Sequence, residues 1–150
     1  MPFSAYDWAA SRCARKECCP QEISRALLSK GVPTDEVEAL MARLETEGYL
    51  NEERYALAFV RDKFRFDHWG RVKIAAALRQ KGIGAAPTEA ALAEGIDEEE
   101  YREALQELIR SRQHTTRADT DYALQQKVAR SVIARGFEPG LVFRELRMED

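Results

Sequence analysis

One pattern occurs three times along this chain and limits the folds that it can adopt. Residues 20–32 align without a gap with residues 71–83, and residues 125–137 form a third copy, at offsets of 51 and 54 residues. Each copy has helical spacing of its apolar residues and ends in a basic residue, a glycine and an apolar residue. Because glycine readily adopts the left-handed conformation that ends a helix, each copy predicts a helix with a glycine stop.

Residues that typically start or end helices also occur between the copies, and sequence patterns typical of strands are nearly absent. Gly48 and Gly95 follow further helix-compatible segments, while Pro20, Pro87 and Pro139 stand where a first-turn proline can begin a helix. The sequence predicts nine helices, at residues 5–17, 20–30, 34–47, 51–66, 70–81, 87–94, 97–113, 120–135 and 139–147. The predicted fold is therefore all-α.

The repeat divides these helices into three tandem three-helix modules, at residues 1–48, 49–96 and 97–150. A module of about 50 residues buries only a modest core, so each module should need packing against its neighbour for stability. Such repeats form an elongated, curved array with a long surface for weak contacts. That shape suits a protein that lies along a polymer.

Charge is distributed in blocks along the chain. The whole chain carries 23 Lys and Arg against 26 Asp and Glu, a net charge of −3, which does not fit a protein that simply coats DNA. Residues 49–83 and 108–147 nevertheless carry +4 each, while residues 84–107 carry −7. The basic blocks can face nucleic acid or an acidic protein surface, and the acidic block can face a basic protein surface. Alternatively, all three blocks are helix faces exposed to solvent that bind no partner.

Aromatic and basic residues alternate within residues 61–73. There Phe64, Phe66 and Trp69 stand among cations that can hold phosphates, an arrangement typical of single-strand binding, although helical core packing also explains the rings. The local excess of positive charge selects six candidate binding residues: Arg61, Lys63, Arg65, Arg71, Lys73 and Arg79. Lys30, Lys81 and Arg135, by contrast, are expected to serve the ends of their helices.

Enzymatic chemistry has no support in the sequence. The chain lacks a phosphate-binding loop, a His-Glu-x-x-His motif and a nucleophile elbow, so we expect a non-enzyme without cofactor. Cys13, Cys18 and Cys19 lack zinc-site spacing, and we expect them reduced, with Cys13 on the apolar face of the first helix. With neither an apolar run of membrane-spanning length nor a secretory signal, a cytoplasmic protein is expected.

Three stretches together resemble the central repeat of the RecX family of regulatory proteins. They are Gly48-Tyr49-Leu50-Asn51-Glu52-Glu53-Arg54-Tyr55-Ala56, Trp69-Gly70-Arg71-Val72-Lys73-Ile74 and Leu78-Arg79-Gln80-Lys81-Gly82-Ile83. The first repeat matches over residues 15–31 and the third over residues 127–137. Arg71 departs from the proline common in the family, and the link between the second and third repeats is acidic. We expect no long basic N-terminal extension of the kind that some relatives carry.

The resemblance implies a modulator, generally an inhibitor, of the RecA recombinase. Such a protein lodges in the groove of the RecA filament on single-stranded DNA and suppresses strand exchange, ATP hydrolysis and coprotease activity, which affects DNA repair and recombination. We expect a monomer with weak direct DNA binding. Whether it blocks, caps or dismantles filaments stays open.

Two other interpretations remain. Three short helices before Gly48-Tyr49-Leu50 also resemble the start of a winged helix-turn-helix, which predicts a DNA-binding regulator. The missing wing hairpin and the threefold repeat oppose it. A generic helical adaptor is the third interpretation, and it would need no preference for filaments.

Overall fold

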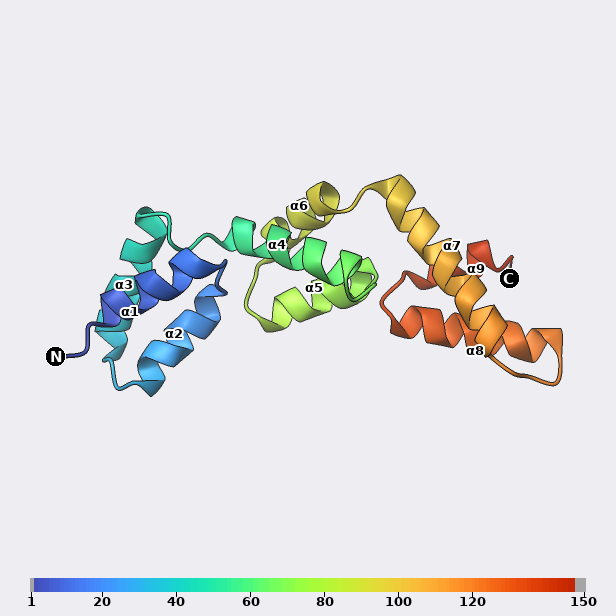
Figure 1. Cartoon of the computed structure of the whole chain (residues 1–150), viewed down its shortest axis with the longest axis horizontal. Coiled ribbons are helices and arrows are strands. Elements are labelled where there is room, and N and C mark those ends of the chain that lie inside the picture. The colour runs from blue at the N-terminus through green and yellow to red at the C-terminus, as the bar shows by residue number, and fades with distance from the viewer. Residues whose placement is uncertain (1, 148–150) are drawn as a thin grey trace.

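The computed structural model describes residues 2–147, which contain nine α-helices and no strand (Figure 1). The helices are α1 (Ala5–Arg15), α2 (Pro20–Ser29), α3 (Thr34–Thr46), α4 (Glu52–Arg65), α5 (Arg71–Gln80), α6 (Ala85–Gly95), α7 (Glu98–Thr115), α8 (Asp121–Ala134) and α9 (Pro139–Glu145). The prediction of an all-α fold is confirmed.

The helices lie in an elongated row of three groups, α1–α3, α4–α6 and α7–α9 (Figure 1). The N-terminus lies at one end of the row and the helices of the last group at the other. The tandem three-helix array is thus confirmed, while the residues at which one module ends and the next begins stay a prediction. We refer to the groups as the first, second and third helix groups.

The threefold repeat appears as three equivalent helices, α2, α5 and α8. Their repeated apolar positions are all buried, at Ile23, Ile74 and Val128 and again at Leu27, Leu78 and Val132. Lys30, Lys81 and Arg135 cap the three helices, followed by Gly31, Gly82 and Gly136 with φ of +89°, +82° and +104°. The predicted glycine stops are confirmed at these three positions.

Helix α6 departs from the prediction at both ends. It begins at Ala85, two residues before Pro87, and includes Gly95, which does not adopt a positive φ. A Cβ on Gly95 would lie 2.9 Å from Val60 Cγ1 and 3.2 Å from Leu57 Cδ1. Gly95 is therefore explained by close packing of α6 on α4 rather than by a left-handed stop.

The equivalent helices meet end to end, but the two contacts differ in kind. Where α5 begins, Gly70 N donates to Arg135 O (2.8 Å) and Val72 N donates to Gly136 O (2.9 Å), at the end of α8. Where α2 begins, the contact with the end of α5 uses side chains, because Cys19 Sγ donates to Lys81 O (3.3 Å). Backbone-to-backbone hydrogen bonds thus join the second and third groups at this point, whereas a side chain makes the equivalent contact between the first and second groups.

The hydrophobic cores follow the same division. One cluster of buried residues is shared by the second and third groups, from Ala56 to Leu146, whereas a separate cluster from Ala9 to Leu50 serves the first. Cys13 belongs to the separate cluster, as predicted, and burial raises the pKa of its thiol. The first group therefore has a core of its own beside the larger unit.

Two features are absent from the described residues. None of the helices there is long and apolar enough to cross a membrane. Nor do residues 2–147 hold three His, Cys, Asp or Glu side chains placed to bind one metal ion.

Candidate binding surface

Cations and aromatic rings alternate along a strip of the second helix group. Lys73 Nζ lies 4.5 Å and Lys63 Nζ 4.9 Å from the centre of the Trp69 ring. Lys63 Nζ also lies 5.6 Å from the centre of the Phe59 ring, and Lys81 Nζ lies 5.8 Å from the same ring. We call this set, Lys73, Trp69, Lys63, Phe59 and Lys81, the cation–ring ladder.

The local structure explains how the ladder is assembled. Phe59 and Lys63 are one turn apart on α4, which places them on the same face of the helix. Trp69 follows α4, and its backbone N–H donates to Lys63 O (3.0 Å), so the ring returns toward the helix. Lys73 lies in the first turn of α5 and Lys81 caps its last turn.

One of the three cations of the ladder, Lys73, has no carboxylate partner among the described residues. A cation over a ring is attracted to the π-face without being neutralised, unlike a cation paired with a carboxylate. Lys63 pairs with Asp67 (2.9 Å) and Lys81 with Glu22 (2.7 Å), but Lys73 makes no ion pair with the described residues. The hydrogen bond to Glu22 raises the pKa of Lys81, so its ammonium stays charged at neutral pH.

The six candidate residues occupy three kinds of position. Lys63 and Lys73 meet at the Trp69 ring. Arg61, Arg65 and Arg79 are exposed and make no ion pair within the described part of the chain; Arg61 and Arg65 lie one turn apart on the same face of α4. The structure thus brings two of the six together over one ring.

Arg71, the sixth candidate, lies in the contact between the second and third groups. Its guanidinium pairs with Glu138 and with Glu98, both at 2.8 Å, and stands 3.9 Å from the centre of the Tyr101 ring. The Tyr101 hydroxyl accepts a hydrogen bond from Arg71 N (3.0 Å) and donates to Glu138. Burial and the bond to Glu138 raise the pKa of Tyr101, so the phenol remains a donor.

The three rings of residues 61–73 have three different surroundings. Phe64 is buried and lies 5.8 Å, centre to centre, from Tyr101. Phe66 is 76% exposed, and Trp69 is half-buried in the ladder. Core packing therefore accounts for Phe64, while the ring of Trp69 holds the ammonium groups of Lys63 and Lys73 over its face.

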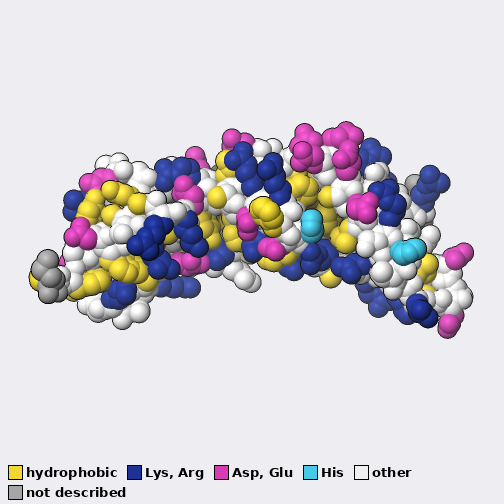
Figure 2. Space-filling view, viewed as in Figure 1, with side chains coloured by type: hydrophobic (Ala, Val, Ile, Leu, Met, Phe, Trp, Pro, Cys, Tyr) yellow, Lys and Arg dark blue, Asp and Glu magenta, His cyan; other side chains and the backbone are white. Residues whose placement is uncertain are grey.

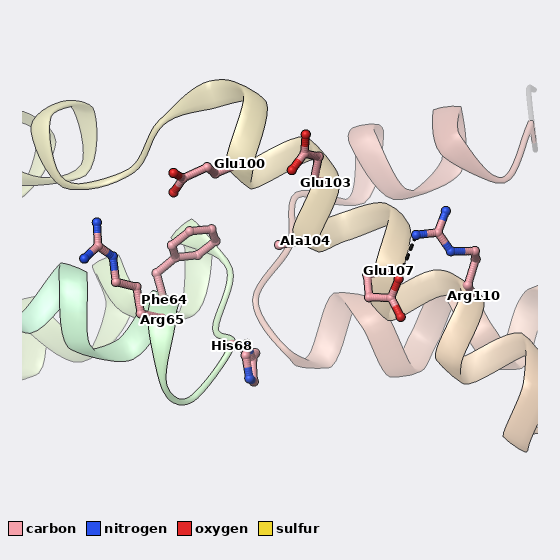
Figure 3. A pocket seen from close by; sticks show the side chains of 8 residues that line it. All are labelled: Phe64, Arg65, His68, Glu100, Glu103, Ala104, Glu107 and Arg110. Carbon is pink, nitrogen blue, oxygen red and sulfur yellow. Dashed lines mark hydrogen bonds and ion pairs between the residues drawn. The ribbon is translucent and has the colours of Figure 1, made fainter.

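A notch of about 490 Å³ separates the end of α4 from α7 (Figure 3). Arg65 and His68 line one wall, and the carboxylates of Glu100, Glu103 and Glu107 project from α7 on the other. These acidic side chains belong to a wider group over the first turns of α7 (Figure 2). The acidic block of the sequence therefore forms a surface distinct from the ladder.

Sequence reasoning missed Phe59 and Lys81 as ladder members. The spacing of Phe59 and Lys63 is visible in the sequence as one helical turn. Lys81, however, reaches Phe59 only because α5 packs beside α4, and no local pattern reports that approach.

Models of the second and third three-helix domains of RecX match residues 51–92 and 98–146. "Regulatory protein RecX" of Xanthomonas axonopodis pv. citri is 33% identical over 124 residues, covering 83% of this chain and 74% of that protein. The protein of the same name from Pseudomonas fluorescens is 33% identical over 135 residues, covering 89% and 83%.

Solved structures show the same fold. A crystal structure of regulatory protein RecX matches with a TM-score of 0.85 at 24% identity, covering 97% of this chain and 70% of that one. RecX from Lactobacillus salivarius matches with a TM-score of 0.85 at 21% identity, covering 96% and 93%. The domain matches and the relatives above 30% identity show that the chain belongs to the RecX family of regulatory proteins.

Proposed function

We propose that this chain binds the RecA filament on single-stranded DNA and modulates it, mainly by inhibiting recombinase, ATPase and coprotease activity. Membership of a family of regulatory proteins supports the regulatory role. The observation that carries the proposal is the cation–ring ladder, set on an elongated row of helices.

The shape supports binding to a polymer of repeated protomers. A row of three helix groups can contact neighbouring protomers at once, and such bridging turns weak contacts into useful avidity when the spans match. We propose that modules 1–48, 49–96 and 97–150 are the units of this bridging. The protein acts as a monomer in the cytoplasm and holds no cofactor.

The charge pattern supports different partners for different surfaces. Lys63 and Lys73 of the ladder, with the exposed Arg61, Arg65 and Arg79, face phosphates or acidic protein surface. The carboxylates of α7 face basic protein surface (Figure 2). Arg71 contributes by fixing the angle between the second and third groups, which sets the spacing of these surfaces.

Co-sedimentation tests this proposal through partner preference. The protein should sediment with RecA filaments on single-stranded DNA at concentrations where it binds neither unassembled RecA nor naked duplex, because several contacts act together only on the filament. Equal retention by naked duplex would instead support a DNA-binding regulator. Equal retention by an unrelated protein would support a generic adaptor, and either result would overturn the proposal.

A further inference from the structure

Four cations, of which only Lys81 belongs to the ladder, line a cavity of about 450 Å³ between the first and second helix groups. Lys and Arg side chains gather to the left of centre in Figure 2, where α1 ends and α2 begins. The cavity is lined by Trp8, Arg12, Lys16, Glu17, Cys18, Cys19, Glu22, Ile23, Ala26, Ser29, Lys30, Tyr55 and Lys81. We call it the first-group cleft.

The two carboxylates of the cleft already have partners. Glu17 pairs with Arg54 (3.0 Å), and Glu22 pairs with Lys81 (2.7 Å). Arg12, Lys16 and Lys30 make no ion pair with residues 2–147. The cleft therefore has three uncompensated positive charges, although residues 1–48 as a whole carry a net charge of −2.

An aromatic ring holds two of these cations in place. Lys30 Nζ lies 4.8 Å and Arg12 Cζ 5.5 Å from the centre of the Trp8 ring. The ring restrains both side chains without neutralising them, which lowers the entropy lost when an anion binds. A volume of about 450 Å³ also falls within the usual range of ligand sites.

We infer that the first-group cleft binds an acidic peptide segment of a partner protein, with carboxylates on Arg12, Lys16 and Lys30. A nucleic-acid strand fits less well, because it carries a phosphate at every nucleotide and cannot leave out the charges that would lie beside Glu17 and Glu22. The Trp8 ring is engaged by two cations and is not an open platform for bases. A peptide can instead place neutral side chains beside the two glutamates and its carboxylates on the three cations.

An apolar residue beside the carboxylates would strengthen the contact. Phe3 is 56% exposed, and its ring centre lies 5.9 Å from Lys30 Nζ. This ring offers an apolar surface beside the cationic one. The preferred segment therefore combines acidic and apolar side chains.

Fluorescence anisotropy of the full chain with short labelled peptides, without RecA or DNA, tests the inference separately from the proposed function. A peptide of repeating Glu-Glu-Leu should bind, and one of repeating Gln-Gln-Leu should not. Replacing Arg12→Glu together with Lys30→Glu should weaken binding about tenfold or more, because two attractive charges become repulsive. Arg102→Glu with Arg110→Glu makes the same change in net charge at exposed ion pairs of α7, in the third group, and should alter binding less than about twofold.

A second variant covers the case in which the double replacement fails to fold. Ser29 is exposed in the cleft, so Ser29→Glu adds a negative charge there without removing packing, and it should weaken the Glu-Glu-Leu peptide several-fold. Unchanged affinity in a folded cleft variant would overturn the inference. A second result would also overturn it. If oligothymidylate displaces the peptide and binds the same variants more weakly, the cleft is a nucleic-acid site.

Discussion

Alanine in place of Gly136 should lower the free energy of unfolding by about 3 kcal/mol, from backbone strain and overpacking together. Gly136 has a φ of +104°, and an added Cβ would lie 2.4 Å from Lys73 Cβ and 2.9 Å from Lys73 N. Gly70 faces it so closely that a Cβ there would lie 2.4 Å from the backbone of Gly136. Neither backbone can move away without breaking the hydrogen bonds that join α5 to the end of α8.

Two other glycines separate these contributions in urea unfolding followed by circular dichroism. Gly31, equivalent to Gly136 in the repeat, has a φ of +89° but nothing within 4 Å of an added Cβ, so Gly31→Ala should cost about 1–2 kcal/mol through conformation alone. Gly140→Ala in α9 meets neither problem and should change stability by no more than about 1 kcal/mol. A cost for Gly136→Ala no larger than that for Gly31→Ala would contradict the tight junction.

Reversing two charges of the ladder should have the second large effect, on binding rather than stability. Lys63→Glu with Lys73→Glu should weaken binding to RecA filaments on single-stranded DNA about tenfold or more. Both ammonium groups stand over Trp69, so the change removes the most concentrated charge among the candidate residues. If the two lysines contact phosphates, the plot of log affinity against log salt concentration should become shallower, with the magnitude of its slope reduced by about 2.

Co-sedimentation across a salt series measures both quantities. Lys63→Gln with Lys73→Gln keeps the length of the side chains and should give a smaller loss than the glutamates. Arg43→Glu with Arg102→Glu makes the same change in net charge at exposed ion pairs away from the ladder and should lose little affinity. Equal losses in the ladder and control variants would assign the effect to net charge and remove the ladder from the binding surface.

Local sequence rules predicted much of the fold because each helix carries its own signals. The equivalent positions of α2, α5 and α8 are buried as the repeat requires, and the glycine after each has a positive φ. The rule that such a glycine ends its helix in a left-handed conformation failed at Gly95, because this glycine is needed for tertiary packing. There α6 approaches Val60 too closely for any side chain. A glycine needed for packing looks the same in sequence as one needed for a turn.

The binding surface was harder to predict because it depends on which helices lie side by side. The sequence selected Lys63 and Lys73, but only the return of Trp69 toward α4 shows that they share a ring. Arg71 has the same charge as its neighbours, yet Glu98 and Glu138, distant in sequence, turn it into a link between helix groups. The local excess of positive charge did not indicate the first-group cleft, because its cations lie mainly in residues 1–48, which have a net negative charge.

ATP hydrolysis by RecA on single-stranded DNA, titrated with this protein, tests the central proposal most directly. We expect the rate to fall. A fall well below equimolar protein indicates capping or long-range disruption of filaments, whereas a fall that needs stoichiometric protein indicates occupation of the groove. An unchanged rate with the cognate RecA and an excess of folded protein would contradict the proposal that this chain modulates the filament.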